Sequence, residues 1–212
     1  MEGTAVTVES VTEVGPSTVA LELATPEDFE ALPGQFVLLR AAPEGEEVAR
    51  HYTLSSPTVE ETFEITVGVD PDGELAPWLA SLEGGETVHV EGPFGTIAYE
   101  GDGDVVAVAG GPGIGPAVAI AEAAQGASHD AAVIYQDDEP AHTERLEVLS
   151  EAGATVTVLE ADDDEGLEMA VDAHLEDGQC YVFGFADFVD RVAEAIEAAG
   201  GDPDEARIEN FG

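Results

Sequence analysis

A change of pattern near residue 100 constrains the fold of this chain more than any other feature. Residues 4–99 contain six short runs that alternate apolar and polar side chains or are rich in β-branched residues, separated by turn sequences such as VGPS and EGGE. This pattern predicts antiparallel strands. After the sequence EGDGD, apolar runs such as VVAVAG alternate with segments of helical pattern, which predicts a parallel sheet covered by helices. We therefore expect two domains, residues 1–100 and residues 101–212.

The six early runs predict an antiparallel barrel or sandwich, with one helix at about residues 74–82 between the last two strands. The later part predicts a doubly wound α/β domain, in which helices lie on both faces of a parallel sheet. Its strands are expected at residues 105–111, 131–136, 155–161 and 179–184, with a possible last strand at residues 206–212.

The charge of the chain excludes several classes of partner. Five Arg and no Lys stand against 47 Asp and Glu, which gives a formal net charge of −42. Such a charge repels the phosphates of nucleic acids and the headgroups of anionic membranes, so we exclude both as partners. The acids are spread along the chain. That spread fits a high-salt, haloarchaeal-type cytoplasm, where the Debye length is about 3 Å or less and self-repulsion is screened.

Cysteine and histidine usage narrows the chemistry further. The single Cys180 excludes an internal disulfide and a four-Cys iron–sulfur cluster within this chain. The five His do not cluster at ligand spacing, so no metal site is expected. The first residues lack the pattern of a signal peptide, and the apolar runs are far shorter than the roughly 20 residues of a membrane helix. These features predict a soluble, cytoplasmic protein.

The clearest local signal is the glycine-rich turn AGGPGIGPAVAI, residues 109–120, between a buried strand and a helix. Glycines in such a turn let the backbone approach a pyrophosphate, and a helix N-terminus favours the anion. The match to G-x-G-x-x-G is imperfect, because Pro116 occupies the last position, and Pro112 removes one backbone N–H. A tight strand–helix turn that binds nothing is the alternative.

A second signal is the sequence RHYTLSS, which begins at Arg50. A guanidinium can bind a diphosphate, and a phenol can stack on a flavin ring. Hydroxyls can form hydrogen bonds with ring nitrogens and phosphate. The alternative is a strand with an exposed Arg and a core Tyr. His51 is expected on the strand face opposite Arg50 and Tyr52.

Together these motifs resemble the ferredoxin–NADP reductase superfamily. RHYTLSS is similar to its R-x-Y-[ST]-x-x-S flavin motif, LPGQFV (residues 32–37) to its P-G-Q-F, and GPFG (residues 92–95) to the turn that closes its barrel. GGPGIGP resembles its nicotinamide-nucleotide loop, and IENFG its C-terminal strand. The resemblance covers nearly the whole chain. It implies a Greek-key, FAD-binding β-barrel and an NAD(P)-binding α/β domain, with hydride passing between nicotinamide and flavin.

The resemblance also implies roles for individual residues. Tyr52, stacked on the isoalloxazine, and Thr53, bonded near its reactive nitrogen, are the expected catalytic pair. Arg50 is expected to hold the FAD diphosphate. The other expected cofactor-binding residues are Ser56, Gly73, Glu74, Leu75, Ala76, Gly110, Gly111, Gly113, Ile114, Pro116, Asp137, Gly184 and Phe211.

Two further features bear on the nicotinamide nucleotide. Asp137 and Asp138 follow the second α/β strand, where they would repel a 2′-phosphate and accept a hydrogen bond from a free 2′-OH. We therefore favour NADH over NADPH, with Arg145 the nearest cation. Phe183 stands where many relatives of the family have a Cys that aligns the nicotinamide.

Three functions follow as hypotheses. The first is an NAD(P)H-dependent flavoprotein reductase that passes electrons to a carrier such as ferredoxin or another flavin. The second is an electron-transfer subunit for a partner dehydrogenase, since the chain is similar to the flavoprotein partner of dihydroorotate dehydrogenases but lacks the cysteines of their cluster. The third, suggested by Phe183 and Pro112, is a non-catalytic nucleotide-sensing module.

Overall fold

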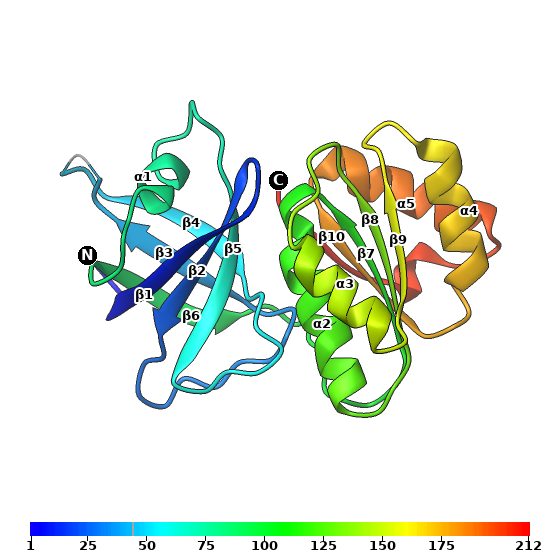
Figure 1. Cartoon of the computed structure of the whole chain (residues 1–212), viewed down its shortest axis with the longest axis horizontal. Coiled ribbons are helices and arrows are strands. Elements are labelled where there is room, and N and C mark those ends of the chain that lie inside the picture. Colours follow the sequence, from blue (N-terminus) through cyan, green and yellow to red (C-terminus); the bar gives the residue numbers. More distant parts are fainter. Residues whose placement is uncertain (44) are drawn as a thin grey trace.

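The computed structural model describes residues 1–43 and 45–212. Its first six strands form an antiparallel sheet, and its last five form a separate parallel sheet flanked by helices. Figure 1 shows the two units side by side. The predicted order, an antiparallel β domain followed by an α/β domain, is confirmed.

The antiparallel unit is a barrel of six strands and one short helix. These elements are β1 (Thr4–Gly15), β2 (Thr18–Ala24), β3 (Phe36–Ala41), β4 (Val48–Thr53), β5 (Thr62–Gly68), α1 (Ala76–Ala80) and β6 (Thr87–Phe94). The strand order is β4-β3-β6-β1-β2-β5. Directly after β4, Leu54 bridges Ile65 of β5, so the two ends of the sheet meet and the barrel closes in Greek-key order.

Alternating apolar residues fill the barrel. Leu21, Leu39 and Ile65 are completely buried and come from three different strands. The short helix α1 lies between β5 and β6, as predicted, and its Leu79 is also completely buried in this core. The helix is therefore anchored to the barrel by packing, which fixes the loop that precedes it.

The parallel unit alternates strands and helices. Its elements are β7 (Val105–Gly110), the 3₁₀ turn η1 (Gly111–Gly113), α2 (Ile114–Gly126), β8 (Ala131–Gln136), α3 (Thr143–Glu151), β9 (Thr155–Leu159), α4 (Asp164–His174), β10 (Gln179–Gly184), α5 (Ala186–Ala198), the 3₁₀ turn η2 (Pro203–Glu205) and β11 (Arg207–Asn210). The order is β11-β10-β7-β8-β9, and each neighbouring pair is parallel. The possible last strand is thus present.

Both faces of this sheet are covered. Tyr135, Tyr181 and Phe183 pack under α2 and α3, whereas Ile134 and Val182 pack under α4 and α5. Figure 1 shows α2 and α3 on the side of the sheet that faces the barrel. The strands β7, β8 and β10 are buried on both faces, which explains their continuous apolar sequences.

The strand order places a crevice beside the barrel. From β7 the chain runs to β8 and β9 on one side, and later to β10 and β11 on the other. In such sheets ligands bind at the carboxyl ends of the strands where the order reverses. Here that point is the end of β7, where Pro112 packs against Gly68 of β5. None of the described helices has the length and apolar character needed to span a bilayer.

Candidate functional site

A cavity of about 530 Å³ lies between the barrel and the carboxyl ends of the parallel strands. This volume is within the usual range of small-molecule and cofactor sites. Of the residues expected to bind a cofactor, the following line it: Arg50, Tyr52, Thr53, Gly73, Glu74, Leu75, Ala76, Pro116 and Phe211. The cavity therefore brings together residues that are up to 161 positions apart in the sequence, from Arg50 to Phe211.

The strand β4 supplies the polar wall of the cavity. Arg50 is exposed and donates a hydrogen bond to the carbonyl of Ala49, 2.8 Å away. Within the described residues no carboxylate lies at ion-pair distance from Arg50, although Arg40 on the next strand has three such partners. An arginine that faces a cavity without an acidic partner fits the diphosphate of a dinucleotide cofactor.

Tyr52 stands between the barrel core and the cavity. It is paired in register with Val37, which is completely buried. Burial raises the pKa of Tyr52 to about 12, with Arg50 acting weakly in the opposite direction. The phenol thus stays protonated and neutral at any physiological pH, as suits a ring that stacks on a ligand.

Thr53 and His51 lie on the other face of β4. Thr53 is buried, whereas His51 is exposed and contacts Phe36 edge-on, with ring centroids 5.2 Å apart. His51 was expected to point away from Arg50 and Tyr52, and the register agrees. Nevertheless His51 and Phe36 also line the cavity. The reason is that β4 ends the strand order of the sheet, so the cavity can extend around its edge.

The glycines of the loop after β7 lie behind the cavity wall. A Cβ at Gly113 would overlap the backbone of Phe183, and one at Gly110 would stand 2.6 Å from the ring of Phe188. Gly111 has a φ of +56°. Ile114 is completely buried and does not line the cavity. Packing and backbone conformation therefore require these glycines, whether or not a nucleotide binds.

Two aromatic rings close the cavity at the carboxyl end of the parallel sheet. Phe185, which follows β10, and Phe211, which follows β11, lie edge to face with centroids 5.9 Å apart. The amide of Phe211 donates to the carbonyl of Gly184 at 2.9 Å, which holds the end of the chain against β10. Glu209 also lines the cavity, and burial raises its pKa.

Phe183 does not reach the cavity through its side chain. It is completely buried under α2, while Cys180 lies on the opposite face of β10 in the core under α4 and α5. Burial raises the pKa of Cys180 to about 12, so its thiol is unreactive. The two positions are three residues apart on a regular strand, and no kink brings them to one face.

Asp137 lies outside the cavity lining, at the carboxyl end of β8. Its carboxylate accepts hydrogen bonds from the Tyr135 hydroxyl and the Glu139 amide, both at 2.9 Å. Asp138 accepts from the Ala161 amide at 2.9 Å. Arg145 faces the barrel instead of this edge, so it is not directed toward a 2′-phosphate.

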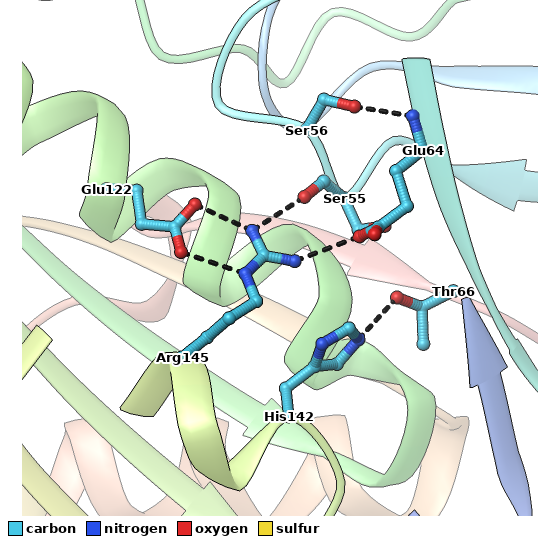
Figure 2. A network of polar contacts seen from close by, with 7 residues as sticks. All are labelled: Ser55, Ser56, Glu64, Thr66, Glu122, His142 and Arg145. Atoms are coloured by element: carbon cyan, nitrogen blue, oxygen red, sulfur yellow. Dashed lines mark hydrogen bonds and ion pairs between the residues drawn. The ribbon is translucent and has the colours of Figure 1, made fainter. Parts of the chain in front are cut away.

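Ser56 is placed in a polar group between the two domains that the sequence did not indicate. We call this group the Arg145 cluster; it comprises Ser55, Ser56, Glu64, Thr66, Glu122, His142 and Arg145 (Figure 2). The Ser56 hydroxyl accepts a hydrogen bond from the Glu64 amide. The Ser56 side chain therefore contacts β5, and the cofactor-binding role expected of Ser56 stays a prediction.

Several cavity residues were not among the site residues expected from the sequence. They are Phe36, His51, Thr66, Gly68, Asp70, Phe185, Glu209 and Asn210, together with Pro112, which the sequence indicated only as a departure. Phe36 lies inside PGQF, His51 inside RHYTLSS, and Glu209 and Asn210 inside IENFG, so those motifs could have suggested them. Thr66, Gly68 and Asp70 carry no local signal, because tertiary packing of β5 against η1 brings them to the site.

Comparison with known proteins agrees with this geometry. Residues 5–99 match the family model of the oxidoreductase FAD-binding domain. A glycine betaine monooxygenase reductase subunit of Chromohalobacter salexigens is 44% identical over 89 residues, which are 40% of this chain and 24% of that protein. NADH-cytochrome b5 reductase 1 of Emericella nidulans is 36% identical over 107 residues, 48% of this chain and 34% of that protein. The chain thus matches only about a quarter to a third of the length of these two relatives.

Solved structures extend the likeness to the second domain. A ferredoxin NADP⁺ reductase from Neisseria gonorrhoeae with bound FAD and NADP has a TM-score of 0.82 at 20% identity, covering 99% of this chain and 98% of that one. The flavohem-like FAD/NAD binding domain of a Vibrio cholerae nitric oxide dioxygenase has a TM-score of 0.80 at 21% identity, with both chains covered completely. At these identities the likeness concerns the fold.

The match to the oxidoreductase FAD-binding domain thus extends over nearly all of the barrel. The α/β domain follows the barrel as it does in these structures, so the whole chain has the two-domain fold of the ferredoxin NADP⁺ reductase from Neisseria gonorrhoeae.

The geometry around His142 predicts a pH effect on stability. Burial, and then the charge of Arg145, lower the pKa of His142 to about 3, whereas it is about 6.5 in an unfolded chain. Between these values the unfolded state binds a proton that the folded state does not, so stability falls as pH decreases from about 6.5 toward 3. His142→Asn, which tolerates the residue's φ of +54°, removes this titration.

Denaturant unfolding of both proteins in the same salt, at several pH values between 6.5 and 4, measures the effect. The free energy of unfolding of the wild type should fall relative to the variant by up to about 1.4 kcal/mol per pH unit. The raised pKa of Glu64, caused mainly by burial, acts in the opposite direction in both proteins. A difference that does not change with pH contradicts the prediction.

Proposed function

We propose that this chain is an NADH-dependent flavoprotein reductase, with FAD held by residues 1–100 and the nicotinamide nucleotide by residues 101–212. The observation that carries the proposal is the cavity itself. One wall carries Arg50, Tyr52 and Thr53 in the order of a flavin motif, and the other is the strand-order switch point of the α/β sheet. At this boundary a hydride donor held by one domain could meet a flavin held by the other face to face.

Each part of the proposed FAD site has a physical basis. Arg50 would pair with the diphosphate, and the backbone of Gly73 to Ala76, which also lines the cavity, would face the same group. Tyr52 would stack on the ring system with its phenol protonated. The Thr53 hydroxyl would donate to a ring nitrogen.

The α/β domain would present the second substrate. Gly110, Gly111, Gly113, Ile114 and Pro116 would border its pyrophosphate, with Asp137 on its ribose and Gly184 beside its nicotinamide. Bound FAD would accept a hydride from the reduced nucleotide and release electrons to a carrier. Phe185 and Phe211 would exclude water from the meeting point, since both rings line the cavity.

The electron acceptor is proposed from relatives. The chain is similar to the reductase subunit of a monooxygenase and to a cytochrome b5 reductase. We therefore propose a protein redox partner such as ferredoxin or a partner dehydrogenase. The alternative of an electron-transfer subunit in a larger flavoprotein complex is favoured by the first of these likenesses. The alternative of a nucleotide-sensing module is weakened by the burial of Phe183 away from the cavity.

The function is tested by spectroscopy of the purified protein in multimolar KCl. We expect a yellow protein with a flavin spectrum that bleaches anaerobically on addition of NADH, and more slowly with NADPH, because Asp137 and Asp138 repel a 2′-phosphate. A protein that takes up no FAD, or one whose flavin neither nucleotide reduces, contradicts the proposal. Faster reduction by NADPH contradicts only the placement of Asp137 at the ribose, and the proposed reductase function stands.

Arg50→Ala should lose FAD affinity by roughly 10- to 100-fold, the value of a charge-assisted hydrogen bond to a diphosphate. The measurement is a titration of apoprotein with FAD by flavin fluorescence. Arg40→Ala is the matched control, because Arg40 lies on the adjacent strand but pairs with Glu47 and Glu91, at 3.0 and 2.6 Å, away from the cavity. Equal affinities of the two variants would show that the diphosphate is held elsewhere.

We further propose that the protein works in a high-salt, haloarchaeal-type cytoplasm, because a net charge of −42 destabilises a compact chain at low ionic strength. The midpoint of thermal unfolding should rise as KCl increases through the molar range, and a non-ionic osmolyte at equal osmolarity should raise it less. A midpoint that is highest in dilute buffer would refute this environment.

A further inference from the structure

The Arg145 cluster joins the two domains directly behind the cavity. Arg145, on α3, donates to both carboxylate oxygens of Glu122 on α2, at 2.8 and 2.7 Å. It also donates to Glu64 of β5 at 2.9 Å and to the carbonyl of Ser55 at 2.8 Å. Figure 2 shows the guanidinium between these groups. One side chain therefore connects two elements of the α/β domain to two segments of the barrel.

On the barrel side, the cluster holds the continuation of the flavin-motif strand. Ser55 lies two residues after Thr53, and its hydroxyl donates to the same Glu64 oxygen that Arg145 contacts, at 2.7 Å. Its amide donates to the Glu64 carbonyl at 2.8 Å. A displacement of Ser55 relative to Arg145 would be transmitted along the backbone to Thr53 and Tyr52 in the cavity wall.

On the other side, the cluster holds the helix that begins at the opposite wall. Glu122 and Pro116 both lie on α2, and Pro116 lines the cavity. Because an α-helix is stiff over two turns, the position of Glu122 determines that of Pro116. Arg145 thus links the two cavity walls, one through the helix α2 and the other through the backbone between Thr53 and Ser55.

A second contact fixes the distance between the walls. The Nε2 atom of His142 lies 2.8 Å from the hydroxyl of Thr66, a buried residue that also lines the cavity. Gly115 of α2 fits directly against Thr66 and Ser55. A Cβ at Gly115 would overlap the Thr66 hydroxyl and stand 2.6 Å from the Thr66 Cβ. The domains therefore approach as closely as a glycine allows.

We propose that Arg145 is a positioning residue for hydride transfer: it holds the two cavity walls at the separation that brings the nicotinamide to the flavin. This inference rests on the proposed function. The physical basis of the positioning role is that a misplacement of about 1 Å between reacting groups can slow a reaction by about 100-fold. Without Arg145, the partly buried carboxylates of Glu64 and Glu122 would lose the cation between them, and the hydrogen bonds that join α2 and α3 to the barrel would be lost.

The first test compares Arg145→Met with Arg40→Met. Arg40 is a matched control, because its side chain is 19% exposed against 23% for Arg145, and its carboxylate partners are all in the barrel. Stopped-flow reduction of the FAD-loaded proteins over a range of NADH concentrations separates the limiting rate from the NADH concentration that gives half of it. We expect Arg145→Met to lower the limiting rate by about 10- to 100-fold, with FAD affinity within about three-fold of wild type.

Arg40→Met should leave the limiting rate unchanged. Arg145→Lys, which keeps the charge but loses the two-pronged contact with Glu122, should give an intermediate rate. A purely stabilising role of Arg145 predicts instead a lower unfolding midpoint with a wild-type limiting rate, and that result overturns the inference.

The second test changes the spacing between α2 and Thr66 without removing a charge. It therefore tests the inference even if Arg145→Met does not fold. Gly115→Ala inserts a methyl group between α2 and Thr66. Gly126→Ala makes the same change at the end of the same helix, where an added Cβ would have no atom within 4 Å apart from its chain neighbours and the helix backbone. We expect a lower limiting rate for Gly115→Ala only, with little change in the half-saturating NADH concentration. Equal rates for the two variants overturn the inference while the reductase function stands. If NADH and NADPH fail to reduce wild-type flavin, the proposed function fails, and the inference fails with it.

Discussion

Three polar groups from both domains accept four hydrogen bonds from the guanidinium of Arg145, and this contact joins the two domains. A half-buried arginine with two carboxylates stabilises a structure only if its geometry is good, because each ion loses hydration. The planar fork of Arg satisfies this condition, since it reaches Glu122 in two places and still has donors for the barrel. Gly115 lets the domains approach closely enough for these hydrogen bonds. The cavity wall and the charged contact behind it are therefore consequences of the same close approach.

Most of the fold followed from the sequence because its two halves have different hydrophobic periods. Alternating runs predicted the six barrel strands, and the continuous apolar runs at β7, β8 and β10 correspond to strands buried on both faces. The boundaries were less accurate: the helix expected at residues 74–82 is only Ala76–Ala80. Closure of the barrel through Leu54 and Ile65 had no sequence signal, because it depends on a single bridge outside the regular strands.

The candidate site was predictable where one strand carries several functional groups. Arg50, Tyr52 and Thr53 were recognised together and line the cavity together. Strand alternation gave the correct face for His51 but not its proximity to the cavity, because alternation does not reveal that a strand ends a sheet. The cavity wall in the α/β domain was harder to predict, because the ends of several strands and helices form it. The pairing of Arg145 with groups 81 and 90 residues away had no local signal.

The high-salt environment that we propose for this acidic chain would determine how its few cations can act. Where the Debye length is about 3 Å, charges that are not in contact hardly interact. Arg145 retains its effect under these conditions, because its hydrogen bonds are 2.7 to 2.9 Å long and partly shielded from solvent. Arg50 is exposed, so it can select an anionic cofactor only by direct contact and not by attraction from a distance. Binding of a diphosphate would then depend on how accurately the domains place the rest of the cavity, which links the cofactor site to the contact made by Arg145.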